Sequence, residues 1–74
     1  MVVAATNNYL KEFRQRLGLA QAGLAVLAKV SPNTVLSIER WGHMPGEAVR
    51  RRIAEALHVR VTDIWPESGH EGAA

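Results

Sequence analysis

The sequence predicts one all-α domain in which four helices and a short closing turn surround a single hydrophobic core. The chain has 74 residues, enough for one such core and no more. Four stretches repeat apolar residues at helical spacing, and none shows the alternation typical of a strand. The sequence has no cysteine, so disulfides and thiolate metal sites are excluded and helix packing must hold the fold together.

The first two helices are expected over about residues 8–17 and 21–28. Asn7 or Asn8 can cap the first helix through a side-chain oxygen, and Gly18 ends it because glycine adopts the left-handed conformation freely. The inward residues are Leu10, Phe13, Arg14 and Leu17 on the first helix, and Leu24, Ala25 and Ala28 on the second.

The third and fourth helices are expected over about residues 32–40 and 46–57. Ser31 caps the third, and Pro32 suits its first position because an N–H there would have no helical partner. A turn over residues 62–65 closes the fold before Pro66. The inward residues are Val35 and Ile38 on the third helix, and Val49, Ile53 and Leu57 on the fourth.

Basic charge is modest but uneven along the chain, whose net charge is +2. Glu67 and Glu71 lie in residues 67–74, a tail expected to be disordered because it lacks apolar periodicity. Residues 50–52 are three consecutive arginines and form the densest basic run. Such a run favours a polyanionic partner, most commonly nucleic acid, although a solvated helix face explains it equally well.

Residue patterns typical of enzymes and metal sites are not present in the sequence. His43, His58 and His70 are scattered without zinc-site spacing, and Glu47 and Glu55 lie two turns apart on one helix. We therefore expect no metal, no cofactor and no enzymatic activity. The opening MVVAATNNY lacks the pattern of a signal peptide, and no apolar run approaches a membrane span, so we expect a cytoplasmic protein.

Only about three residues separate the second and third helices, so the two must cross steeply, as in a helix-turn-helix. The stretch LGLAQAGLAVLAKVSPNTVLSIER, followed by PGEAVRRRIAEAL and VTDIW, resembles the phage repressor–Cro (XRE-type) helix-turn-helix family. The resemblance covers roughly residues 9–66. It implies a compact five-helix, repressor-like domain over residues 8–66 that binds operator DNA, usually as a homodimer.

In that family the third helix lies in the major groove with its N-terminal residues at base edges. The resemblance places Pro32, Asn33 and Ser37 in the slots that face the bases. Asparagine can pair bidentately with adenine, serine or threonine can serve base or phosphate, and proline offers only an apolar contact. The expected DNA-binding residues are Gln21, Ser31, Pro32, Asn33, Thr34, Ser37 and Arg40.

Phosphate contacts are expected from Lys29, Arg40, Arg50 and the N-terminus of the fourth helix, because the loop WGHMP lacks the basic residues common in relatives. Arg14 and Glu39 match a family pair that forms a structural salt bridge between the first helix and the end of the third.

Several positions depart from the family pattern. Lys29, Trp41 and His58 occupy slots where glycine is common, and a positive φ there would cost on the order of 1 kcal/mol each. At Trp41 the alternative is a third helix one residue longer, capped by Gly42. Ala20 at the N-cap of the second helix and Gly23 within it should each weaken that helix by about 1 kcal/mol.

Apolar residues at positions that are usually polar leave the function open to a second interpretation. Val26, Leu27 and Leu36, together with Trp41, can mark a contact with another protein. The main hypothesis is a homodimeric transcriptional repressor. The alternatives are an antitoxin or accessory regulator with a protein partner, or a protein-interaction module on a degenerate scaffold. The dimer is supported by the family and by an apolar cluster that could instead close the core: Val59, Val61, Ile64 and Trp65.

Overall fold

Five helices follow one another in the computed structural model, which describes residues 8–66. They are α1 (Leu10–Arg16), α2 (Gln21–Ala28), α3 (Pro32–Trp41), α4 (Glu47–Leu57) and α5 (Val61–Ile64). No strand occurs among the described residues, so the all-α expectation is confirmed. The expectations for Asn7, His70 and the tail over residues 67–74 lie outside this part of the chain.

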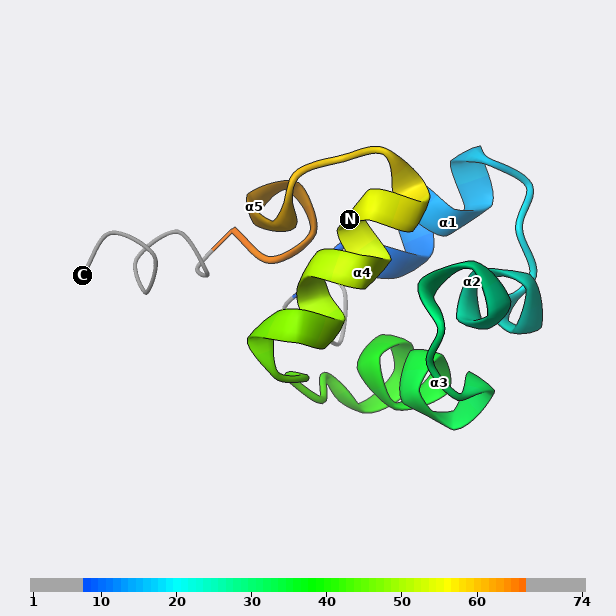
Figure 1. Ribbon diagram of the computed structural model, residues 1–74, viewed down its shortest axis with the longest axis horizontal. Coiled ribbons are helices and arrows are strands. Elements are labelled where there is room, and N and C mark those ends of the chain that lie inside the picture. The colour runs from blue at the N-terminus through cyan, green and yellow to red at the C-terminus, as the bar shows by residue number, and fades with distance from the viewer. Residues whose placement is uncertain (1–7, 67–74) are drawn as a thin grey trace.

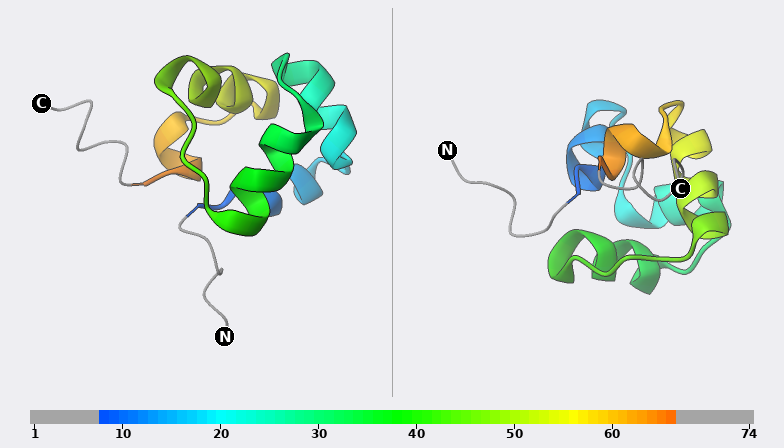
Figure 2. Two further views of the ribbon diagram at one scale, coloured as in Figure 1. Left: turned by 90° about the horizontal axis from the view of Figure 1, so that it is seen from below. Right: turned by 90° about the vertical axis from the view of Figure 1, so that its left-hand side faces the viewer.

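The helices are arranged so that α3 lies at one side of the molecule. α2 packs against both α3 and α4, α4 packs against α5, and α1 contacts α3 (Figure 1). Figure 2 shows α3 along the lower side in its right-hand view, with α1, α4 and α5 on the side away from it. One face of α3 is therefore built into the domain, and the opposite face is left free.

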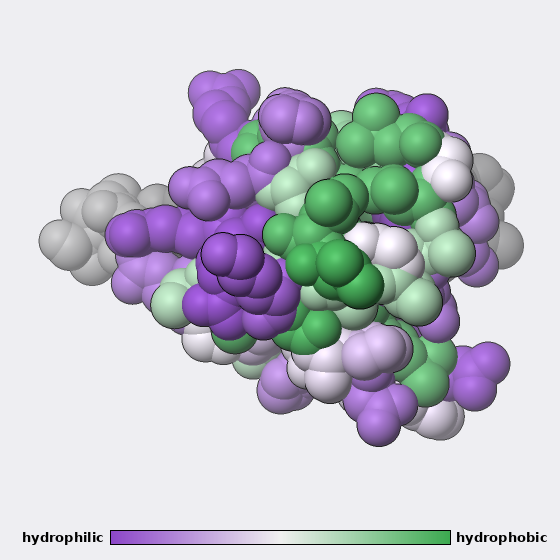
Figure 3. Space-filling view, turned by 45° about the vertical axis from the view of Figure 1, so that its right-hand side comes forward, coloured by the Kyte–Doolittle hydropathy of each residue, from purple (hydrophilic) through white to green (hydrophobic). Residues whose placement is uncertain are grey.

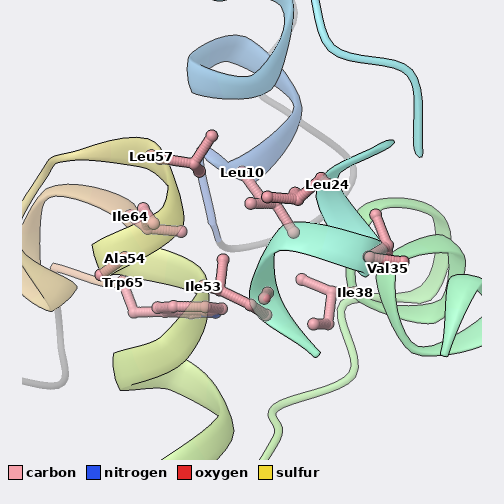
Figure 4. Packing of buried hydrophobic residues seen from close by; sticks show 11 residues of the cluster. Leu10, Leu24, Val35, Ile38, Ile53, Ala54, Leu57, Ile64 and Trp65 are labelled. Carbon is pink, nitrogen blue, oxygen red and sulfur yellow. The ribbon is translucent and has the colours of Figure 1, made fainter. Parts of the chain in front are cut away.

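The core receives side chains from every helix, as Figure 4 shows. Its fully buried members are Leu10, Leu24, Ala25, Ala28, Val35, Ile38, Ile53, Ala54, Leu57, Ile64 and Trp65. Phe13 and Val49 are half-buried against this core, whereas the expectation that Leu17 points inward is wrong. Leu17 is 51% exposed because α1 ends at Arg16 and the chain turns away at Gly18, where φ is +70°.

Local hydrogen bonds explain where the helices begin. α1 starts at Leu10, whose N–H donates to Asn8 Oδ1 at 3.0 Å, while Asn8 Nδ2 donates to the carbonyl of Ile38 at 3.0 Å. Asn8 thus ties the start of α1 to α3. α5 starts one residue earlier than expected because the N–H of Arg60 donates to Asp63 Oδ2 at 2.9 Å and fixes the first turn.

Two of the three glycine-like slots have the strained backbone that the sequence predicts. Lys29 and His58 both have φ of +60° and end α2 and α4 in the left-handed conformation. Trp41 instead continues α3 as its last residue, and Gly42 takes the left-handed position with φ of +73°. Of the two alternatives at this position, the longer helix is therefore the one found.

Replacing Lys29 or His58 by glycine should raise the free energy of unfolding by about 0.5–1 kcal/mol each, because steric strain outweighs the added chain entropy. Urea denaturation would measure both effects. Gly18→Ala is the matched control, because no atom lies within 4 Å of the position that a Cβ would occupy there. It should lose about 1 kcal/mol through conformation alone, and no gain at Lys29 or His58 would show that the turns impose no strain.

Candidate nucleic-acid interface

α3 presents one apolar face and one polar face because its residues alternate with helical period. Val35 and Ile38 are fully buried and fix the inner face in the core. Ser31 Oγ accepts the N–H of Thr34 at 3.2 Å, and the two hydroxyl oxygens lie 3.1 Å apart. With Pro32 in the first turn, this cap starts the helix firmly and holds Ser31 and Thr34 together.

The outer face of α3 collects the residues expected to face bases. Pro32 and Asn33 are exposed in the first turn, Ser37 is half-buried one turn later, and Arg40 is exposed near the end. An open depression of about 300 Å³ lies on this face and is lined by Asn33, Thr34, Ser37, Trp41 and His43. The surface is open and accessible, and it combines the apolar indole of Trp41 with amide and hydroxyl groups that can donate and accept.

A buried ion pair fixes this face relative to the rest of the domain. Arg14 Nε donates to Glu39 Oε2 at 2.6 Å and Arg14 Nη2 to Glu39 Oε1 at 2.9 Å, a bidentate arrangement. Arg14 Nη1 also donates to the carbonyl of Leu19 at 2.7 Å. The hydrogen bond to Glu39 raises the pKa of Arg14 above its ordinary value, although burial acts in the opposite direction.

Gln21 joins the same network from the start of α2. Its Nε2 donates to Glu39 Oε1 at 3.1 Å, so the first residue of α2 is held against the last turns of α3. No side chain of the described residues caps the N-terminus of α2, because Ala20 occupies the N-cap. The structure therefore places Gln21 and the free N–H groups of the first turn of α2 together.

The basic run over residues 50–52 does not form a basic face. Arg50 is only 9% exposed, and its Nη1 donates to the carbonyl of Pro45 at 2.7 Å. The expectation that Arg50 contacts phosphate is therefore wrong, because its guanidinium holds the loop between α3 and α4. Arg52 Nε donates to the carbonyl of Ala28 at 3.0 Å, and Arg51 pairs with Glu47 at 2.7 Å on the surface.

The remaining cations near α3 are accessible. Lys29 and Arg40 are both exposed, one at the turn before α3 and the other in its last turn. Glu39 is the one acidic residue of α3, which the structure describes throughout, and its side chain is 4% exposed in the pair with Arg14. The outer face of α3 consequently carries positive charge and no exposed carboxylate.

Apolar residues are exposed on α2. Val26 is 76% and Leu27 is 56% exposed, whereas Leu36 is half-buried. Figure 3 turns the right-hand side of Figure 1 forward, and hydrophobic surface spreads over this side, where α2 lies. Val26 and Leu27 therefore remain candidates for a protein contact, while Leu36 leaves less of its side chain accessible.

The C-terminal apolar cluster belongs to the core. Ile64 and Trp65 are fully buried, and Val59 and Val61 are half-buried against the core residues. Trp65 packs beside Ile53 and Ala54 of α4 (Figure 4). This cluster therefore closes the fold and offers little surface for a second subunit, so it no longer supports a dimer.

Across residues 8–66, no group of three or more histidine, cysteine, aspartate or glutamate side chains is placed to hold a metal ion. No helix in the described part of the chain is long and apolar enough to cross a membrane. A family model described as helix-turn-helix (HTH_3) matches residues 10–64, which include all five helices. Comparison with curated proteins gives no match.

Proposed function

The chain belongs to the helix-turn-helix family, whose members are DNA-binding regulators of transcription, and from this premise we propose that it is a homodimeric repressor. It recognises a specific double-stranded DNA sequence by placing α3 in the major groove. The observation that carries the proposal is the outer face of α3, where Asn33 and Ser37 are accessible while the carboxylate of Glu39 is buried. A free carboxylate on this face would repel the phosphates that flank the groove.

Each residue of this face has a distinct role in the proposal. The exposed amide of Asn33 can donate to and accept from one adenine, and the hydroxyl of Ser37 can bond to a neighbouring base. Pro32 offers its ring to a thymine methyl. Ser31 and Thr34 bond to each other in the helix cap, so their hydroxyls serve the structure first and a phosphate second.

Phosphate binding comes from both helices of the motif. Lys29 and Arg40 supply charge, and the N-terminus of α2 supplies free N–H groups beside Gln21. With Arg50 buried, few cations remain on this surface. We therefore expect a shallow dependence of affinity on salt, because each neutralised phosphate contributes about 0.9 to the slope of log K against log salt.

Selection of the purified protein against a randomised duplex pool tests the proposal. A homodimer should enrich a palindrome whose half-sites lie about one helical turn, or roughly 34 Å, apart. Asn33→Ala should then relax one base position in each half-site, because a bidentate pair with a base is worth about 1–3 kcal/mol of discrimination. The matched control is Arg40→Ala, which should weaken binding to all sequences alike and reduce the salt slope.

The exposed Val26 and Leu27 favour a second candidate, in which the chain acts as an antitoxin or accessory regulator through a protein bound to α2. The same selection separates both of these DNA-binding candidates from the third alternative, a protein-interaction module on a degenerate scaffold. A protein-interaction module without DNA recognition would enrich no duplex, and any residual binding would vanish at modest salt. A single unrepeated half-site would argue against the homodimer while retaining DNA recognition.

A further inference from the structure

Trp41 lies on the same face of α3 as the proposed base-contacting residues. Asn33, Ser37 and Trp41 follow one another at spacings of four, so they form one row along the helix surface. The open depression on this face is lined by all three. Trp41 therefore continues the proposed DNA-binding surface by one turn rather than facing the exposed apolar residues of α2.

The end of α3 holds the indole outward. The helix continues through Trp41, Gly42 makes the left-handed turn, and the N–H of His43 donates to the carbonyl of Ser37 at 3.2 Å. Trp41 is 72% exposed, whereas the other tryptophan of the chain, Trp65, is 1% exposed. So large an apolar surface on a firmly capped helix gains free energy when a partner covers it.

Charge around the indole favours a polyanion over an apolar protein surface. The guanidinium carbon of Arg40 lies 5.8 Å from the centre of the Trp41 ring, so a cation stands beside the apolar group. The one acid of α3, Glu39, is bound to Arg14 inside the domain. DNA offers the matching combination, because its phosphates lie next to C–H groups of deoxyribose and of the thymine methyl.

We propose that Trp41 is a further DNA-contacting residue, which packs its indole against C–H groups of the duplex while Arg40 meets an adjacent phosphate. This inference rests on the proposed function and extends it, since it adds a large aromatic contact to the amide, hydroxyl and proline contacts already proposed on this surface. The C–H groups belong either to a thymine methyl or to a deoxyribose, and these two sources differ in whether the contact depends on sequence.

The test measures binding of fluorescently labelled, selected duplex by anisotropy, with wild type, Trp41→Ala and Leu27→Ala. Trp41→Ala should weaken binding roughly 10-fold, as expected when one large apolar side chain is no longer buried against the duplex. Leu27→Ala removes another exposed apolar side chain, from α2, and should change little. Acrylamide should quench the fluorescence of Trp41 in the free protein and much less in the complex. The buried Trp65 also fluoresces, but acrylamide should quench it little in either state.

Replacing thymine by uracil in the duplex identifies the C–H group. If the indole packs on a thymine methyl, one uracil position weakens the wild type and leaves Trp41→Ala unaffected. If it packs on a deoxyribose, uracil has no effect and Trp41→Ala weakens all duplexes alike. The inference is overturned if Trp41→Ala binds the duplex as tightly as wild type and acrylamide still quenches Trp41 in the wild-type complex. The exposed indole would then be available to a protein partner instead. If the selection enriches no duplex for the wild-type protein, both the proposed function and the inference about Trp41 are overturned.

Discussion

Replacing Glu39 by alanine should lower the free energy of unfolding by about 3–5 kcal/mol, because it leaves the guanidinium of Arg14 in the protein without its carboxylate. The two side chains are 10% and 4% exposed and share two hydrogen bonds, of 2.6 and 2.9 Å. A domain of this size has a stability of roughly 5–15 kcal/mol, so the loss is a large fraction of the total. Urea denaturation followed by circular dichroism would measure it.

The chain contains a matched control for this substitution. Glu47 and Arg51 form an ion pair of 2.7 Å, but both side chains are about two-thirds exposed. Glu47→Ala should therefore cost no more than about 0.5 kcal/mol, the usual value of an exposed helix pair. A double variant, Arg14→Met with Glu39→Leu, should recover most of the stability that Glu39→Ala loses. If Glu39→Ala costs no more than Glu47→Ala, the pair does not hold α1 to α3.

Sequence patterns predicted the helices well because their ends carry strong local signals. α2 begins where expected although the side chain of Ala20 cannot cap it. It ends where expected because Lys29 adopts the left-handed conformation. α3 is limited by Ser31 at one end and by Gly42 at the other. The errors amount to one or two residues at the helix ends. α1 is shorter because its first turn is set by Asn8, whose partner Ile38 is 30 residues away.

The candidate site was predicted less completely, because hydrogen bonds between distant residues decide which charges are free. Arg50 precedes Ile53 by three and Leu57 by seven, a spacing that places it on the inner side of α4. Its charge suggested an outward position, whereas the helical period was the better guide. The bond from Arg52 to the carbonyl of Ala28 has no comparable sequence signal, since it depends on how α4 packs against α2.

Trp41 was open to two interpretations for a similar reason. The sequence grouped it with the apolar residues Val26, Leu27 and Leu36 as a possible protein contact. The spacing from Asn33 and Ser37 instead places it on the proposed DNA-binding face. That choice required knowing that α3 extends through Trp41, which local sequence left undecided between a helical residue and a turn.

Replacing Trp65 by alanine should lower the free energy of unfolding by about 3–5 kcal/mol, the usual cost of removing a large aromatic side chain from a core. Trp65 is among the largest fully buried side chains and packs where α4 meets the C-terminal end of α5. Its indole N–H has no hydrogen-bond partner among the described residues. Trp65→Phe, which retains an aromatic ring and removes that N–H, should therefore cost much less.

Substitutions of the two tryptophans test whether the C-terminal apolar cluster closes the core or contacts a second subunit. Trp41→Ala, at the exposed position, should change stability by no more than about 0.5 kcal/mol, whereas Trp65→Ala should shift the urea midpoint strongly.

Analytical ultracentrifugation of folded Trp65→Phe should show the same association state as wild type at equal concentration, because the ring lies inside one chain. If Trp65→Phe keeps wild-type stability but dissociates a dimer, the cluster of Val59, Val61, Ile64 and Trp65 has a role between subunits after all. Equal association with a graded loss of stability from phenylalanine to alanine would assign the cluster to the core, and the proposed homodimer would then have to form through another surface or on the DNA itself.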